Sequence, residues 1–231
     1  MKLLALDTSS VACSVALQID DAVVERHEEQ PREHSRLLLP MIESVLGEAG
    51  AALPDLDAIV LGNGPGSFIG MRIAASVAQG LAYGAGLNIV PVSSMAAVAA
   101  QVFVENDAAE VVVAQDAHMH EVYLGMYRLD GNNRPADVVP ERLQGPTAIA
   151  ELQAELGGPR VAAGFGWQRY PELLEANRKY FDDVSDVLHP RATALLGLAV
   201  AAMNSGKTVT PQDIVPAYLR QKVAEKPGRV S

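Results

Sequence analysis

Residues 2–19, KLLALDTSSVACSVALQI, decide the fold of this chain. Lys2–Asp7 is an almost wholly apolar run that predicts a buried strand, and the polar TSS that follows predicts a tight turn. Ala12–Ile19 predicts a second strand, and Ala22–Glu28 predicts a third beyond another short turn. Three strands joined by short turns predict an antiparallel meander. A Rossmann domain begins differently, because its first strand leads directly into a helix.

The next stretch alternates helical and strand patterns. Leu38, Met41, Ile42 and Val45 recur at helical spacing and predict one apolar helix face, while Pro40 is tolerable only near the first turn or at a kink. Further elements are expected as a strand at Leu56–Leu61, a helix from Ser67 to about Tyr83, a strand at Asn88–Val92 and a helix at Ser94–Val104. The first half of the chain is therefore predicted as βββαβαβα.

The pattern restarts after residue 106. The expected elements are strands at Glu110–Asp116, Glu121–Leu129 and Val138–Leu143, a helix at Thr147–Leu156, a strand at Arg160–Ala163, and helices at Pro171–Lys179 and Ala192–Asn204. Two halves that each open with a meander predict an α/β protein of two lobes, residues 1–106 and 107–231, each a mixed sheet flanked by helices. This is the arrangement of the actin-like class, which includes Hsp70 and the sugar kinases. The C-terminal segment is expected to pack back on the first lobe.

The composition is that of a globular protein with little attraction for polyanions. Of the 231 residues, 49% are hydrophobic and 20% are charged, and the formal net charge is -10. Because affinity for nucleic acid is largely electrostatic, we do not expect the chain to bind RNA alone. No apolar run has the length of a transmembrane helix or of a signal peptide, and Cys13 has no second cysteine to pair with. We expect a cytoplasmic protein without membrane contact.

The first turn is one candidate binding site. In the actin-like class the turn after the first strand wraps a phosphate, and here Asp7 supplies a carboxylate while Thr8, Ser9 and Ser10 supply hydroxyl groups. Ser9 takes the place of the glycine that this class usually has two residues after the aspartate. The alternative is a polar turn whose side chains bond their own backbone.

A glycine-rich loop, GNGPGSF at residues 62–68, is a second candidate. It lies between a strand and a helix, where backbone donors and the helix dipole favour anions, so Gly64, Gly66 and Ser67 are expected phosphate contacts. The loop matches neither the Walker pattern nor the dinucleotide fingerprint, and a sharp turn capped by Ser67 is the alternative. Asp116 and Gly164 complete the expected set of vestigial nucleotide contacts.

The helix after this loop is the most informative element. Arg72 is the only charged residue from Ala58 to Val104, so the helix is apolar or small on every side. Such a helix must be covered all round, and its own sheet covers one face. We therefore expect this helix and the preceding one to form a protein–protein interface, the alternative being a helix internal to a three-layer core. The expected interface residues are Leu38, Met41, Ile42, Val45, Phe68, Met71, Arg72, Ala75, Ala78, Gln79 and Ala82.

Groups with catalytic chemistry are sparse. His118, His120 and Glu121 are close in sequence, but zinc in a catalytic site usually takes three protein ligands, and a solvated hairpin explains these residues better. Cys13 has no activating His or Lys beside it in the sequence. We expect no catalytic residue, no metal and no cofactor.

Several motifs occur in an order that resembles one family. They are LALDTSS (residues 4–10), CSVAL (13–17), HS (34–35), LLP (38–40), GPGSF (64–68), RI (72–73), PVSS (91–94), DA (116–117), EVY (121–123) and PAYLR (216–220). Together they resemble the TsaB family, also called YeaZ, of bacterial tRNA threonylcarbamoyladenosine biosynthesis proteins. Most of the motifs lie within residues 2–125, and the last extends the resemblance toward the C-terminus.

The resemblance implies an actin-like fold and a role as paralogue and partner of the catalytic subunit TsaD. With TsaD and the small ATPase TsaE, the family supports transfer of threonylcarbamoyl to the adenosine next to the anticodon of ANN-decoding tRNAs. It further implies that tRNA is contacted only through the complex and that two copies pair when TsaD is absent. The metal-binding histidine pair of TsaD would fall near Pro91–Ala97, where this chain has no histidine, so a non-catalytic subunit is expected.

Two residues depart from the family pattern. Ile69 stands where threonine is usual and His118 where arginine is usual, so a nucleotide contact by either side chain would be lost. Two other functions stay open at this point. A small-molecule kinase or acyltransferase of the same superfamily would need carboxylates such as Asp7, Asp116 and Glu121 in one cleft. A peptidase would need a recognisable nucleophile motif, and the sequence shows none.

Overall fold

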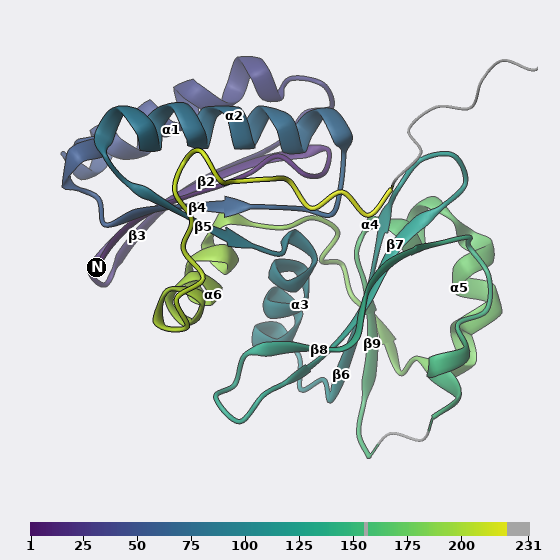
Figure 1. Cartoon of the computed structure of the whole chain (residues 1–231). Helices are drawn as coiled ribbons and strands as arrows, with labels where there is room; N and C mark the ends of the chain where they lie inside the picture. Colours follow the sequence, from purple (N-terminus) through teal and green to yellow (C-terminus); the bar gives the residue numbers. More distant parts are fainter. Residues whose placement is uncertain (155–156, 221–231) are drawn as a thin grey trace, which may run out of the picture.

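The computed structural model describes residues 1–154 and 157–220 as two sheets set side by side (Figure 1). The first sheet holds β1 (Lys2–Asp7), β2 (Ala12–Ile19), β3 (Ala22–Glu29), β4 (Ala58–Gly62) and β5 (Asn88–Val92). The second holds β6 (Glu110–Asp116), β7 (Val122–Leu129), β8 (Pro135–Gln144), β9 (Arg160–Ala163) and β10 (Asp183–Val184). Each sheet thus comes from one half of the chain.

Both sheets have the same topology. The order of the first is β3-β2-β1-β4-β5 and that of the second is β10-β9-β6-β7-β8, so the first strand of each half occupies the centre. In each sheet the opening three strands pair antiparallel and the later two are parallel to the central strand and to each other. The predicted two-lobed actin-like fold, with a meander opening each lobe, is confirmed.

Helices cover the first sheet on both faces. Helices α1 (His34–Ala49) and α2 (Phe68–Ala85) pack on one face, and α6 (Ala192–Asn204) and α3 (Ser94–Glu105) on the other (Figure 1). Helix α3 also contacts the second sheet, since Met95 and Val98 share a core cluster with Val111 and Val113. Helices α4 (Phe165–Arg169) and α5 (Pro171–Asn177) pack on the other face of the second sheet.

The division at residue 106 separates the sheets but not everything packed on them. Helix α6 belongs to the second half of the chain, yet its Leu195 and Leu196 lie in a core cluster of the first sheet. Residues 207–220, which we call the strap, follow α6 back across the first lobe, where Val209 bridges to Ile89 of β5. A division at residue 106 places α6 and the strap in the second lobe, whereas both pack on the first lobe.

One predicted helix is wrong. Residues 147–154 contain only a single 3₁₀ turn at Ala150–Gln153, and residues 155–156 of the expected helix lie outside the part described. The side-chain amide of Asn177 explains the difference, because it accepts from Ile149 N and donates to Thr147 O. These two backbone groups are therefore satisfied outside a helix. Short 3₁₀ turns also occur at Leu53–Asp55 and Arg178–Tyr180.

Among the residues described, no helix combines the length and the apolar character needed to cross a membrane. The basic residues Lys222, Lys226 and Arg229 near the C-terminus fall outside the described ranges.

Candidate functional site: the cleft and the adjoining helix face

A cleft of about 620 Å³ lies where the two lobes meet. From the first lobe its lining includes Ser9, Ser10, Arg32, His34, Ser35, Ser67, Ile69 and Ile73, and from the second half of the chain Gln115, Asp116, His118, Phe165 and His189. Its volume falls within the range of roughly 300–1,000 Å³ that is usual for small-molecule sites. Several of the expected nucleotide contacts therefore do meet at one place.

Asp7 lies beneath this cleft rather than in it. Its side chain is buried, Oδ1 accepts hydrogen bonds from Ser9 N and Ser9 Oγ at 2.7 Å each, and Oδ2 accepts one from Ser94 Oγ at 2.6 Å. Burial raises the pKa of Asp7 above its ordinary value of 3.8, an effect that these donors oppose. A Cβ on Gly62 would overlap the carboxylate, so the close packing depends on that glycine. Asp7, one of the expected nucleotide contacts, is thus enclosed by the protein's own groups.

Thr8 is also part of the scaffold. It is fully buried, and its hydroxyl donates to Gly70 O at 2.6 Å, which ties the first turn to the start of α2. Ser9 lines the cleft, but its hydroxyl proton is committed to Asp7. Ser10 Oγ accepts from Ala12 N, so Ser10 retains a free donor toward the cleft. Thr8, another expected phosphate contact, is likewise enclosed by the protein.

The glycine-rich loop is tied to its surroundings by two of its backbone donors. Gly64 N donates to Ser94 Oγ, and Ser67 N donates to Ser9 O at 2.6 Å. A Cβ on Gly66 would overlap Ser9 O, so this position requires glycine. Ser67 caps α2 as predicted, because its Oγ accepts from Gly70 N at 3.3 Å. Gly64 N and Ser67 N, two donors expected to face a phosphate, are therefore engaged within the protein.

The second lobe contributes a carboxylate at the end of β6. Asp116 Oδ1 accepts from His118 N at 2.8 Å and from Tyr170 OH at 2.9 Å, and its side chain keeps 16% of its surface exposed. Partial burial, together with the hydrogen bond from Tyr170 OH to Asp116, raises the pKa of Tyr170 to about 12, so the phenol stays protonated. Gly164 has a φ of 97°, and a Cβ there would overlap Ala114 O, so Gly164 forms a tight turn behind the cleft.

The turn that follows Asp116 has an unusual backbone. His118, Met119 and His120 have φ values of 57°, 53° and 59°, all in the left-handed region that residues other than glycine seldom adopt. Arg220 of the strap holds this turn, because its Nη2 donates to Ala117 O at 2.9 Å and pairs with Glu121 at 2.6 Å. Within the described ranges, no three His, Cys, Asp or Glu side chains come close enough to hold a metal ion.

The helix face beside the cleft corrects the sequence prediction. Most of the expected interface side chains are buried in the protein's own core, because they point to the first sheet or to the seam between α1 and α2. The buried ones are Leu38, Met41, Ile42, Val45, Met71, Ala75, Ala78 and Ala82. In the isolated chain these side chains therefore expose little surface, as the alternative of an internal helix face predicts, although Leu38 lines the groove between α1 and α2.

A different side of α2 is exposed. Ile69 and Tyr83 expose 70% and 72% of their surface, and Arg72, Ser76 and Gly80 between them are exposed as well. We call these five residues the α2 stripe. Their spacing of three or four residues puts them on one side of the helix over about 21 Å. A shallow groove of about 390 Å³ between α1 and α2 adjoins the stripe and includes Leu39, which is 46% exposed.

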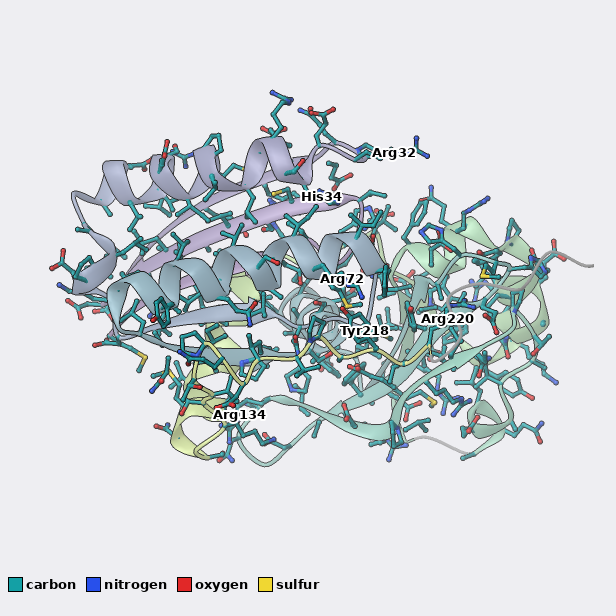
Figure 2. All side chains as sticks on the ribbon, turned by 45° about the horizontal axis from the view of Figure 1, so that its top comes forward. Arg32, His34, Arg72, Arg134, Tyr218 and Arg220 are labelled. Atoms are coloured by element: carbon teal, nitrogen blue, oxygen red, sulfur yellow. The ribbon has the colours of Figure 1, made fainter. Side chains whose placement is uncertain are left out.

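The strap contacts the neighbouring side of α2. The guanidinium of Arg72 lies 3.8 Å from the centre of the Phe68 ring, and Arg72 Nε donates to Tyr218 OH at 2.9 Å (Figure 2). Further along, Gln79 Nε2 donates to Pro211 O at 2.9 Å. Phe68 and Gln79, both expected at a partner interface, thus contact the chain's own C-terminal segment. The PAYLR motif was the only sequence signal for this contact.

Comparison with known proteins agrees with this architecture. Residues 26–227 match the family model described as TsaD: tRNA N6-adenosine threonylcarbamoyltransferase. The tRNA threonylcarbamoyladenosine biosynthesis protein TsaB of Escherichia coli (strain K12) is 39% identical, over 99% of this chain and 100% of that protein. The protein of the same name from Haemophilus influenzae is 37% identical, over 99% and 98%. The solved structure of YeaZ from Pseudomonas aeruginosa has a TM-score of 0.84 at 36% identity and covers 94% of this chain and 99% of that one.

Proposed function

The chain belongs to the TsaB (YeaZ) family, and from this premise we propose that it is a non-catalytic subunit in tRNA threonylcarbamoyladenosine biosynthesis whose task is to bind TsaD. In this proposal it stabilises TsaD in a complex that also contains TsaE. The complex transfers threonylcarbamoyl to the adenosine next to the anticodon, and this subunit meets tRNA only through it. Without TsaD, the same face pairs with a second copy.

The α2 stripe is the observation that carries the proposal. Large side chains, Ile69 and Tyr83, stand at its two ends, and small residues, Ser76 and Gly80, form its middle. Small residues in the middle let the backbone of another helix approach closely, and the large ends fill the space on either side. Tyr and Arg are also the residue types that most often dominate binding energy at interfaces, and both occur in the stripe.

The charge of this face supports docking of another protein. The stripe contains no carboxylate, although the whole chain carries a net charge of -10. Its one charge, on Arg72, lies over the face of the Phe68 ring, and Arg72 Nε donates a hydrogen bond to Tyr218 OH. Desolvating such a surface costs less than desolvating free carboxylates, which favours burial against a partner. An interface of standard size would bury about 800 Å² on each protein.

The first turn supports a role without phosphoryl or acyl transfer. The carboxylate that such chemistry would recruit, Asp7, accepts three hydrogen bonds from Ser9 and Ser94 and lies beneath the cleft. A general base must reach the proton that it removes, and a buried, fully engaged carboxylate does not.

A pair of glycine substitutions tests the docking face. Gly80 and Gly197 both lie in helices, and a Cβ at either position meets no atom within 4 Å. Gly80→Glu places a carboxylate in the middle of the stripe, and Gly197→Glu places one on α6, across the first sheet. Neither change disturbs the monomer's packing, and both replace a residue of poor helix propensity. We expect Gly80→Glu to weaken binding to purified TsaD by at least about tenfold, which corresponds to roughly 1.4 kcal/mol.

Gly197→Glu is the matched control and is expected to bind TsaD like the unmodified chain. Isothermal titration calorimetry gives both dissociation constants, and thermal unfolding establishes that both variants are folded. Undiminished binding by Gly80→Glu would remove the α2 stripe from the interface.

A further inference from the structure

The junction between β3 and α1 forms the first-lobe wall of the cleft. Its lining residues are Pro31 and Arg32 of the connection and His34 and Ser35 at the start of α1. Arg32 is exposed, has a φ of 68°, and makes no hydrogen bond or ion pair with any described residue. Figure 2 shows it at the end of α1 that lies toward the second lobe. An arginine held at a cleft in a left-handed conformation, with no acidic partner, is available to an anion.

The start of α1 adds to the positive potential at this wall. Its N-cap residue, Glu33, makes no capping hydrogen bond, and no acidic side chain lies in the first turn. The Glu33 carboxylate instead accepts from Arg36 on the outer side of the helix. His34 and Ser35, the first residues of α1, line the cleft. The positive end of the helix dipole is therefore not neutralised by a side chain of the first turn.

Two buried imidazoles lie in the same lining. His34 and His189 are each 6% exposed, and the Nδ1 atom of each has no hydrogen-bond partner among the described residues. His34 is oriented by the contact of its Nε2 with Ser10 O at 2.9 Å. Burial lowers the pKa of His189, so its ring is neutral at pH 7. Buried polar atoms without partners are uncommon and call for an explanation. Because a carbonyl can only accept, Nε2 of His34 is the donor and Nδ1 of the neutral ring is an acceptor, which a donor group of a ligand in the cleft would satisfy.

Part of the remaining lining is apolar. Ile69 and Ile73 of α2 and Phe165 of α4 face the cleft between the polar groups of the two lobes. Arg32 and Asp116 are its charged residues, one on each lobe. A fully hydrophilic ligand would leave the apolar side chains unused, whereas a ligand with an apolar group would cover them.

We propose that this cleft binds a small organic anion that carries an apolar group. Arg32, the hydroxyl of Ser35 and the first turn of α1 hold the anionic end, and Ile69, Ile73 and Phe165 contact the apolar end. The site differs from a phosphate site on the first turn, because the hydroxyl of Ser9 is committed to Asp7. It goes beyond the proposed accessory role and does not require TsaD.

Titration of the isolated chain with defined probes tests this site. Phenylacetate and phenyl phosphate carry both an apolar ring and an anionic group, and benzyl alcohol carries the ring without the charge. Acetate and inorganic phosphate carry the charge without the ring. Amide chemical shifts of the ¹⁵N-labelled chain report both affinity and location. We expect at least one ring-bearing anion to bind, with shifts at Arg32, Ser35 and Ile69, and to bind more tightly than benzyl alcohol, acetate and inorganic phosphate.

Charge variants locate the anionic end. Arg32→Gln is expected to weaken binding of the ring-bearing anion by at least about tenfold, as expected for loss of a charge-assisted hydrogen bond. Arg134→Gln removes the same charge from the β7–β8 turn, far from Arg32 in Figure 2, and should leave affinity unchanged. Ser35→Asp places a carboxylate in the first turn of α1, where it stabilises the helix but repels the ligand.

The relative affinities for phenylacetate and phenyl phosphate show whether the site prefers a carboxylate or a phosphate ester. Either preference supports the proposal. Equal affinity for benzyl alcohol and the ring-bearing anions would overturn it. Unchanged affinity in both Arg32→Gln and Ser35→Asp would also overturn it, as would binding of Mg-ATP with no binding of the five probes. Because TsaD is absent from the experiment, these outcomes do not depend on binding of TsaD, and the shifts at Arg32 and Ser35, which lie outside the α2 stripe, separate ligand binding from pairing of two copies through Ile69.

Discussion

Ser94 Oγ donates a hydrogen bond of 2.6 Å to Asp7 Oδ2, joining the end of the first strand to the start of α3, 87 residues later. Ser94 N and Oγ also bond to Gly64, so one serine links the first strand, the glycine-rich loop and α3. The first turn and the glycine-rich loop are the sequence features that most resemble a phosphate site. Hydrogen bonds through Ser94 thus link these two features to each other. The same contacts leave the carboxylate of Asp7 without a free position toward the cleft.

Ser94→Ala should destabilise the protein. The substitution removes one donor from the buried carboxylate of Asp7 and the acceptor for Gly64 N, so we expect a loss of about 1–3 kcal/mol in the free energy of unfolding. Urea denaturation measures this loss. Ser76→Ala, at an exposed position of α2, is the control and should change stability by about 0.5 kcal/mol or less. Equal stability of the two variants would contradict the role assigned to Ser94.

Asp7→Asn should change how stability depends on pH. The pKa of Asp7 is raised by burial, so the folded state binds its proton more tightly than the unfolded state does. This contribution to stability is fully present below the ordinary pKa of 3.8 and is lost as pH rises toward the folded pKa. The asparagine variant has no such proton, so its stability relative to the unmodified chain should rise over that window. The test is to measure the unfolding free energies of both proteins at several pH values from 3 upward. If the value for Asp7→Asn minus that for the unmodified chain stayed constant or fell with pH, the prediction would be contradicted.

Ala78→Asp should unfold the protein rather than impair docking alone. Ala78 is fully buried between α2 and the first sheet, so a carboxylate there has no access to water or to a cation. We expect a loss of about 3–5 kcal/mol, the usual cost of a buried charge without a partner. Gly80→Glu, two residues away on the exposed side, should keep the melting temperature. Similar melting temperatures for the two variants would show that the burial assigned to α2 is wrong.

Arg220→Ala should loosen the left-handed turn on the second lobe. The arginine bonds to the carbonyl groups of Ala117 and His118 and pairs with Glu121, and these contacts hold three residues in a costly conformation. Hydrogen exchange at residues 118–121 should become at least about fivefold faster, as expected when local opening becomes easier. Arg134→Ala, which removes a partly exposed pair with Asp130, is the control. Unchanged exchange in Arg220→Ala would mean that the turn does not depend on the strap.

The sheets could be predicted from the sequence because their signals are local. Runs such as Lys2–Asp7 and Ala12–Ile19, separated by short polar turns, specify a meander, and its repetition after residue 106 specifies two lobes. The N-cap at Ser67 was predictable for the same reason. Short-range patterns therefore determined most of the fold.

The orientation of α2 was predicted wrongly, because its polar side is weak. Arg72, Ser76 and Tyr83 recur at helical spacing and mark the exposed side, but only one of them is charged. Ala75 and Ala78 are chemically indistinguishable from exposed small residues until the sheet and α1 are placed. The sequence predicted that the C-terminal segment packs on the first lobe, but the role of Ser94 and the individual contacts of the strap were missed, because they join distant segments such as Gln79 and Pro211.

The most direct test is threonylcarbamoyl transfer to tRNA in a reconstituted mixture of TsaD, TsaE and this chain. The concentration of each chain variant is set near the dissociation constant of the complex between the unmodified chain and TsaD. We expect no modified nucleoside with this chain alone, full transfer when the unmodified chain or Gly197→Glu completes the mixture, and little transfer with Gly80→Glu. Transfer by the chain alone, or undiminished transfer with Gly80→Glu, would contradict an accessory subunit that acts through the exposed side of α2.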